Sequence, residues 1–65
     1  MAWLSLLQAY VRAGRKNIAA ADVHARAGHP ERAEVALARA RTEHKQYERA
    51  LAAHPEWADE APDLF

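Results

Sequence analysis

Four histidines (His24, His29, His44 and His54) are the residues best suited to metal binding in this 65-residue chain, because it contains no cysteine. A zinc site needs three or four converging ligands, which here would have to be histidine and carboxylate. His44 and Glu48 stand at i, i+4 and can share one face of a helix. His24 and His29 are five residues apart, which is not a ligand spacing on one helical face. We therefore expect no metal and no cofactor, and keep a histidine-bearing, metal-dependent helical assembly as an alternative.

Residues for nucleophilic catalysis are scarce. Ser5 is the only serine and Thr42 the only threonine. Ser5 has no histidine near it in the sequence, so a nucleophile paired with a base is unsupported. The two glycines, Gly14 and Gly28, do not form a phosphate-binding loop and instead indicate helix ends. We expect no catalytic residue and predict that the chain is not an enzyme.

The last residues form a candidate docking peptide. Residues 54–65 carry four acidic and no basic side chains, and they end in Asp63, Leu64 and Phe65. A terminal phenylalanine can fill an apolar pocket while its carboxylate meets a basic residue or a backbone nest. This peptide tip resembles the acidic tip of bacterial single-stranded-DNA-binding proteins. It also resembles the end of the short peptide that docks on bacterial sliding clamps, although Ala61 stands in place of that peptide's glutamine. Either resemblance implies a protein partner; the alternative is that Leu64 and Phe65 pack on the chain's own body.

Charge argues against nucleic acid as the partner. Nine basic and nine acidic residues give a net charge of zero, and nucleic-acid binding depends on neutralising phosphates. A helix-turn-helix centred on Gly28 would place His24, His29 and Glu34 where small or apolar residues are needed. A small DNA-associated regulatory protein is therefore only an alternative.

Location and origin can be inferred only coarsely. The apolar N-terminal stretch has no basic flank and is interrupted by Arg12, so we expect neither a signal peptide nor a membrane span. Without cysteine, nothing indicates an oxidising compartment, and the expected location is the cytoplasm. Seven arginines against two lysines, with abundant alanine, are typical of a GC-rich genome such as that of an actinobacterium or its phage.

Alanine-rich segments with few β-branched residues favour helix throughout. We expect Gly14 and Gly28 to end helices, Asn17 to cap one, Pro30 to begin one and Pro55 to stop one. The predicted fold is all-α, a small bundle of three helices plus a short C-terminal turn. Residues 1–54 would form the helical domain and residues 55–65 an acidic C-terminal tail, which could pack back on the bundle. The three helices are predicted at 2–13, 17–27 and 30–53.

Two apolar patterns predict self-association. Within 30–53 a heptad stripe is spaced 4, 3, 4, 3, 4, 3. Residues 2–13 are apolar nearly all round, more than a small lone core can cover. We therefore predict a homodimer. If the His44 side chains of the two copies pair across a two-fold axis, their protonation would cause repulsion and weaken the dimer. The heptad stripe consists of Ala33, Leu37, Ala40, His44, Tyr47, Leu51 and His54, and the predicted interface residues are Trp3, Leu4, Leu7, Tyr10, Val11, His44, Tyr47 and Leu51.

Residues 3–27 resemble a tetratricopeptide repeat. The matching positions carry tryptophan, leucine, an aromatic residue, glycine, alanine and a large apolar residue. The resemblance implies an antiparallel helix pair that binds another protein, but Leu7 and Lys16 depart from the pattern. The matching residues are Trp3, Leu6, Tyr10, Gly14, Ala19 and Val23, and a fragment at Tyr47, Ala50, Leu51 and Pro55 resembles the end of such a repeat. From all these features we predict a non-enzymatic, self-associating protein–protein interaction module of unknown partner.

Overall fold

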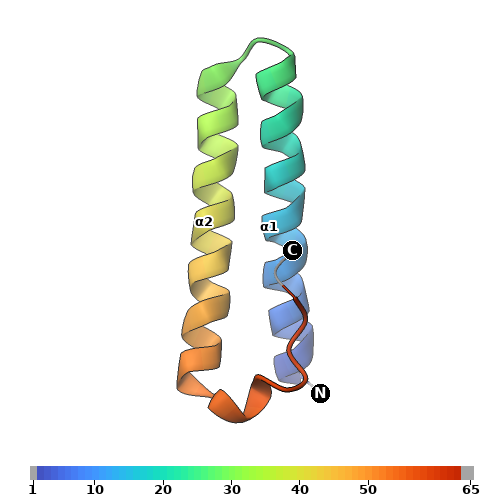
Figure 1. The fold of residues 1–65 in the computed structure, drawn as a ribbon, viewed down its shortest axis with the longest axis vertical. Helices are drawn as coiled ribbons and strands as arrows, with labels where there is room; N and C mark the ends of the chain where they lie inside the picture. The colour runs from blue at the N-terminus through green and yellow to red at the C-terminus, as the bar shows by residue number, and fades with distance from the viewer. Residues whose placement is uncertain (1, 64–65) are drawn as a thin grey trace.

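The computed structural model describes residues 2–63, which form a helical hairpin. Helix α1 covers Ala2–Arg26 and helix α2 covers Pro30–Ala53, and the two lie antiparallel along their whole length (Figure 1). A single 3-10 turn, η1 (Pro55–Trp57), follows α2. The molecule is elongated, with extents of 43 × 16 × 15 Å. The described residues are thus all-α, as the sequence predicts.

The prediction of three helices is wrong, because α1 runs without a break through both of the short helices expected at 2–13 and 17–27. Gly14 lies buried inside α1 instead of ending it. Asn17 is not an N-cap: its side-chain Nδ2 donates to the carbonyl of Ala13 one turn earlier, at 3.0 Å. The helix pair that the repeat resemblance implies within 3–27 is therefore not formed.

The apolar stripe of α1 explains why the helix continues through Gly14. Leu7, Gly14 and Ala21 are spaced by seven residues and are all buried, so they share the side that faces α2. A glycine inside a helix costs about 1 kcal/mol relative to alanine. Here the missing Cβ leaves room for the ring of His44 on α2. A continuous α1 also matches α2 in length, so both helices bury one side along the full hairpin.

The connection between the helices is predicted correctly by its sequence. Gly28 has a φ of 81°, the left-handed conformation that favours glycine. Its N–H donates to the carbonyl of Ala25 at 3.1 Å, and the N–H of His29 donates to the carbonyl of His24 at 2.8 Å. This pair of bonds is a Schellman motif, which ends α1. Pro30 then occupies the first turn of α2, where no N–H is needed.

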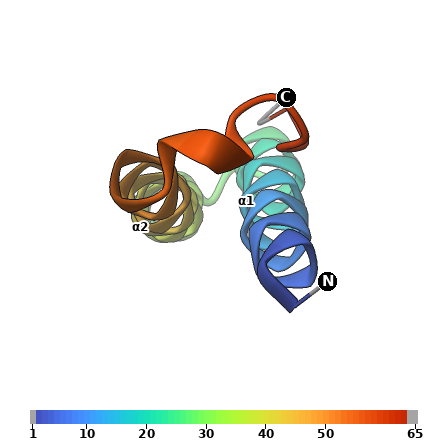
Figure 2. The same ribbon diagram turned by 90° about the horizontal axis from the view of Figure 1, so that it is seen from below.

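The end of α2 returns the chain to α1. The N–H of His54 donates to the carbonyls of Ala50 and Leu51, and Pro55 stops the helix after Ala53, as predicted. The η1 turn then crosses from the end of α2 to α1 (Figure 2). Residues 58–63 run back along α1, on the face turned toward the viewer in Figure 1. We call this face of the hairpin the tail face.

The core consists of two unequal clusters. In the closed half of the hairpin (residues 2–14 and 42–63), Leu7, Val11 and Tyr47 are buried under Trp57 and other apolar side chains. In the loop half (residues 15–41), the cluster contains only alanine: Ala20, Ala21, Ala33 and Ala36. The loop half is therefore held by close helix contact with little apolar volume.

The heptad stripe predicted in α2 is largely the side that faces α1. Ala33, Ala40 and Tyr47 are buried. Leu37 is instead 39% exposed, and Ala36 is buried in the stripe. Ala36 and Leu37 each lie one turn from both Ala33 and Ala40, on the two flanks of this side of α2. The flank with Ala36 is buried, and the flank with Leu37 is exposed.

Candidate functional site

Most of the predicted interface residues gather in the closed half of the chain itself. Leu7 is 0% exposed and, with Val11 and Tyr47, forms the cluster there. Trp3, Tyr10 and Leu51 pack around this cluster, and Leu4 and His44 are half-buried. One copy of the chain therefore covers Leu7 and Val11, and leaves Trp3 and Tyr10 at the edge of the core.

The tail is fixed on the tail face by hydrogen bonds and ring stacking. The hydroxyl of Tyr47 donates to the carbonyl of Pro62. Nη2 of Arg15 donates to the carbonyl of Asp63 at 3.0 Å. The indole of Trp57 stacks on Trp3, with ring centroids 4.9 Å apart and planes at 10°. These contacts join both ends of the described chain at one side of the hairpin.

Trp57 and Tyr47 show how closely the tail covers the core. Trp57 also stacks on His54, with centroids 3.8 Å apart, and Nδ1 of His54 lies 3.3 Å from Oε1 of Glu56. Burial raises the pKa of the Tyr47 hydroxyl above 10.0, and the nearby negative charge of Asp63 raises it further. Tyr47 therefore stays protonated and can donate to Pro62 throughout the neutral range.

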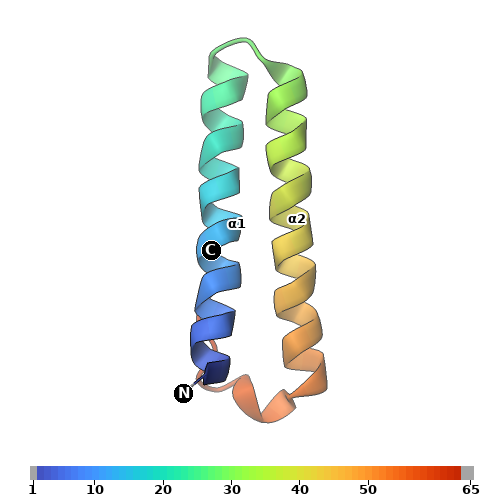
Figure 3. The same cartoon turned by 180° about the vertical axis from the view of Figure 1, so that it is seen from behind.

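The face of the hairpin opposite the tail is uncovered among the described residues, as the view from behind shows (Figure 3). On α1 this face carries six residues whose separations in the sequence alternate between four and three, so they form one straight stripe along the helix. On α2 it carries Val35, which is 51% exposed, between two arginines. We call this surface the open face; it consists of Leu6, Tyr10, Ala13, Asn17, Ala20 and His24 of α1 and Arg32, Val35 and Arg39 of α2.

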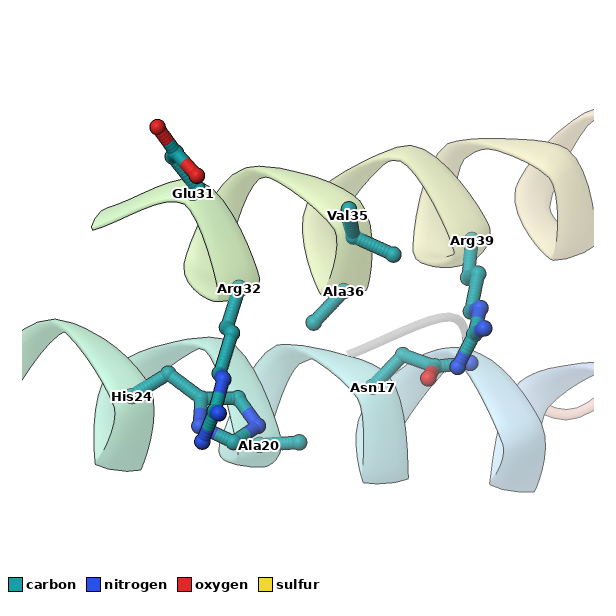
Figure 4. Close-up of a pocket in the computed structure, with 8 residues that line it drawn as sticks. All are labelled: Asn17, Ala20, His24, Glu31, Arg32, Val35, Ala36 and Arg39. Carbon is teal, nitrogen blue, oxygen red and sulfur yellow. The ribbon is translucent and has the colours of Figure 1, made fainter. Parts of the chain in front are cut away.

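A groove of about 400 Å³ runs between the helices in the loop half of the open face. Its apolar part is made by Ala20 of α1 and by Val35 and Ala36 of α2. The side chains of Arg32 and Arg39 extend from α2 toward α1 on either side of Val35 and Ala36 (Figure 4). Small side chains between long basic ones are suited to close contact with another helix.

The open face was not among the predicted interface residues, apart from Tyr10. The signal for it is present in the sequence, because Leu6, Tyr10, Ala13, Asn17, Ala20 and His24 keep heptad spacing across Gly14. A helix end predicted at Gly14 conceals this spacing, since it divides the stripe between two helices.

The remaining candidate residues are dispersed. Among residues 2–63 no three histidine or acidic side chains are placed to hold a metal ion. His29 and His54 lie at the two ends of α2, His24 lines the groove of the open face, and the ring of His44 lies between the helices at Gly14. Of the peptide tip, Asp63 is exposed, whereas Leu64 and Phe65 lie outside the described residues. Within the same range, neither helix has the length and apolar character needed to cross a bilayer.

No family model matches the chain, and no curated protein or solved structure is found to be similar to it.

Proposed function

We propose that the chain is a non-enzymatic, self-associating module in the cytoplasm, in which two hairpins pack through their open faces as a four-helix bundle. The observation that carries this proposal is the exposure of two apolar side chains on the open face: Leu6 (44%), on the otherwise half-buried stripe of α1, and Val35 (51%), on α2. Such a stripe is the pattern that helices bury against other helices. The tail covers the closed half of the opposite face, whereas no described segment lies over any part of the open face.

The extent of the surface also supports a second copy as the occupant. The chain exposes 4753 Å², whereas a compact protein of its mass exposes about 4,200 Å². Its radius of gyration is 13.3 Å, against about 11 Å for a compact chain of this length. A compact dimer would expose about 6,900 Å², so association of two copies would bury about 2,600 Å² in total. This area lies within the range of obligate homodimers.

The loop half of the hairpin would be stabilised most by packing against a second copy. Its core is made of alanines, each of which buries little apolar area compared with leucine or valine. Val35 lies next to Ala36 at the mouth of the groove, so a second helix on the open face would cover it and exclude water from the alanine contact. Self-association would thereby stabilise the part of the hairpin that the tail does not reach.

The test compares two valines. Val35→Glu places a carboxylate on the open face, whereas Val23→Glu places one on the outer side of α1, where Val23 is 63% exposed. Both variants fold as hairpins, because both side chains are largely exposed in one copy. We expect Val35→Glu to weaken the dimer at least tenfold, since the interface would have to desolvate a carboxylate in place of an apolar side chain, and Val23→Glu to leave it unchanged. Light scattering gives the masses; equal masses for the two variants at every concentration would exclude the open face as the interface.

A further inference from the structure

We infer that the two copies pack antiparallel, with the loop half of each hairpin against the closed half of the other. This inference rests on the proposed self-association through the open face and specifies its geometry. Two-fold symmetry allows two arrangements of the hairpins: parallel, with both loops at one end, or antiparallel, with the loops at opposite ends. Two independent features of the chain distinguish them.

The first feature is the distribution of charge along the hairpin. The loop half carries six basic and three acidic side chains, a net charge of +3. The closed half carries three basic and six acidic side chains, a net charge of −3. A parallel dimer would place like halves side by side, whereas an antiparallel dimer places each +3 half beside a −3 half. Since the hairpin is only 16 Å wide, many of these charges would lie within about one or two Debye lengths of each other.

The arginines of the groove make this preference local. Arg32 and Arg39 extend over the open face of the loop half. In a parallel dimer they would approach the same two arginines of the second copy. In an antiparallel dimer they lie beside the closed half of the second copy, whose net charge is −3. The opposite net charges of the facing halves favour this orientation of the two copies.

The second feature is the level of the exposed apolar side chains. At about 1.5 Å per residue, Val35 lies about 7 Å from the loop end and Leu6 about 30 Å from it, in helices about 37 Å long. If the second hairpin is turned end for end, its Val35 lies about 30 Å from the loop end of the first hairpin. An antiparallel dimer therefore places Leu6 of each copy at the level of Val35 of the second copy. A parallel dimer gives each of them only its own symmetry mate.

Distances between spin labels distinguish the arrangements. Ala27→Cys and Ala52→Cys put a single nitroxide at the loop end or the closed end of a chain that has no other cysteine, and both positions are exposed. For the antiparallel dimer we expect about 40 Å between two labels at position 27 and about 30 Å between two at position 52. A mixture of the two labelled chains gives in addition a distance of about 20 Å between positions 27 and 52 of different copies.

Each outcome is informative. Short distances between identical positions, with a long one in the mixture, would overturn the antiparallel arrangement and leave the proposed dimer intact. Dimeric mass with the expected pattern supports both. Absence of any dipolar coupling, together with the mass of a single chain, would overturn the proposed function and this inference with it.

Discussion

Gly14 and His44 meet across the two helices so closely that a Cβ at position 14 would require the His44 ring to shift. A Cβ built on Gly14 would lie 2.8 Å from Nε2 and 2.9 Å from Cδ2 of the His44 ring. The glycine therefore permits close approach between α1 and α2 at the middle of the hairpin. The pair also divides the alanine-rich loop half from the closed half, where larger side chains fill the core.

Gly14→Ala should lower the free energy of unfolding by about 1 kcal/mol. Overpacking against His44 costs about 2 kcal/mol, and the better helix propensity of alanine offsets about 1 kcal/mol of this. In a chain that already carries His44→Ala, the same change should raise the stability by up to about 1 kcal/mol. Urea denaturation of the four proteins measures both effects. If Gly14→Ala has the same sign in both backgrounds, the His44 ring is not what requires the glycine.

Tyr47→Phe should weaken the attachment of the tail. The change removes the hydrogen bond to the carbonyl of Pro62, which contributes about 1 kcal/mol, and leaves the buried ring in place. Hydrogen exchange of the tail amides should become faster, while the amides of the loop half keep their rates. Tyr10→Phe is the matched control, since the Tyr10 hydroxyl forms no hydrogen bond within residues 2–63. Equal acceleration by both changes would show that the Tyr47 bond does not hold the tail.

Alkaline pH should destabilise the fold through Tyr47. Its pKa is raised in the folded chain by burial and by Asp63, so unfolding favours loss of the hydroxyl proton. The stabilising contribution is complete below pH 10, the pKa of an unperturbed tyrosine, and decreases as the pH rises above it. Denaturation at pH 8 to 11 should show this decrease in the unmodified chain, and a smaller one in Tyr47→Phe. An equal decrease in both would mean that another group is responsible.

Elements of the fold that depend on local backbone chemistry were predictable from the sequence. Gly28, Pro30 and Pro55 fix their helix boundaries through φ angles and missing N–H groups, which are properties of the residue and its neighbours. Gly14 has the same local signal as Gly28 and a different outcome. The difference comes from tertiary packing, because the space beside Gly14 is occupied by the ring of His44, which is 30 positions later in the sequence.

The position of the open face could not be predicted from the sequence for a related reason. Apolar density correctly marks Leu7, Val11 and Tyr47 as residues that need burial, but it does not tell whether a second copy or the chain's own tail covers them. The tail also decides which side of the hairpin stays open. The tail's position depends on long-range contacts such as the stacking of Trp57 on Trp3, which neither spacing nor composition reveals.

Sedimentation equilibrium of the unmodified chain over a wide concentration range tests self-association through the open face most directly. We predict a mass of twice 7.3 kDa at micromolar concentration and above, with dissociation to single chains on dilution. A mass of 7.3 kDa at every concentration, for a chain that remains helical, would contradict the account.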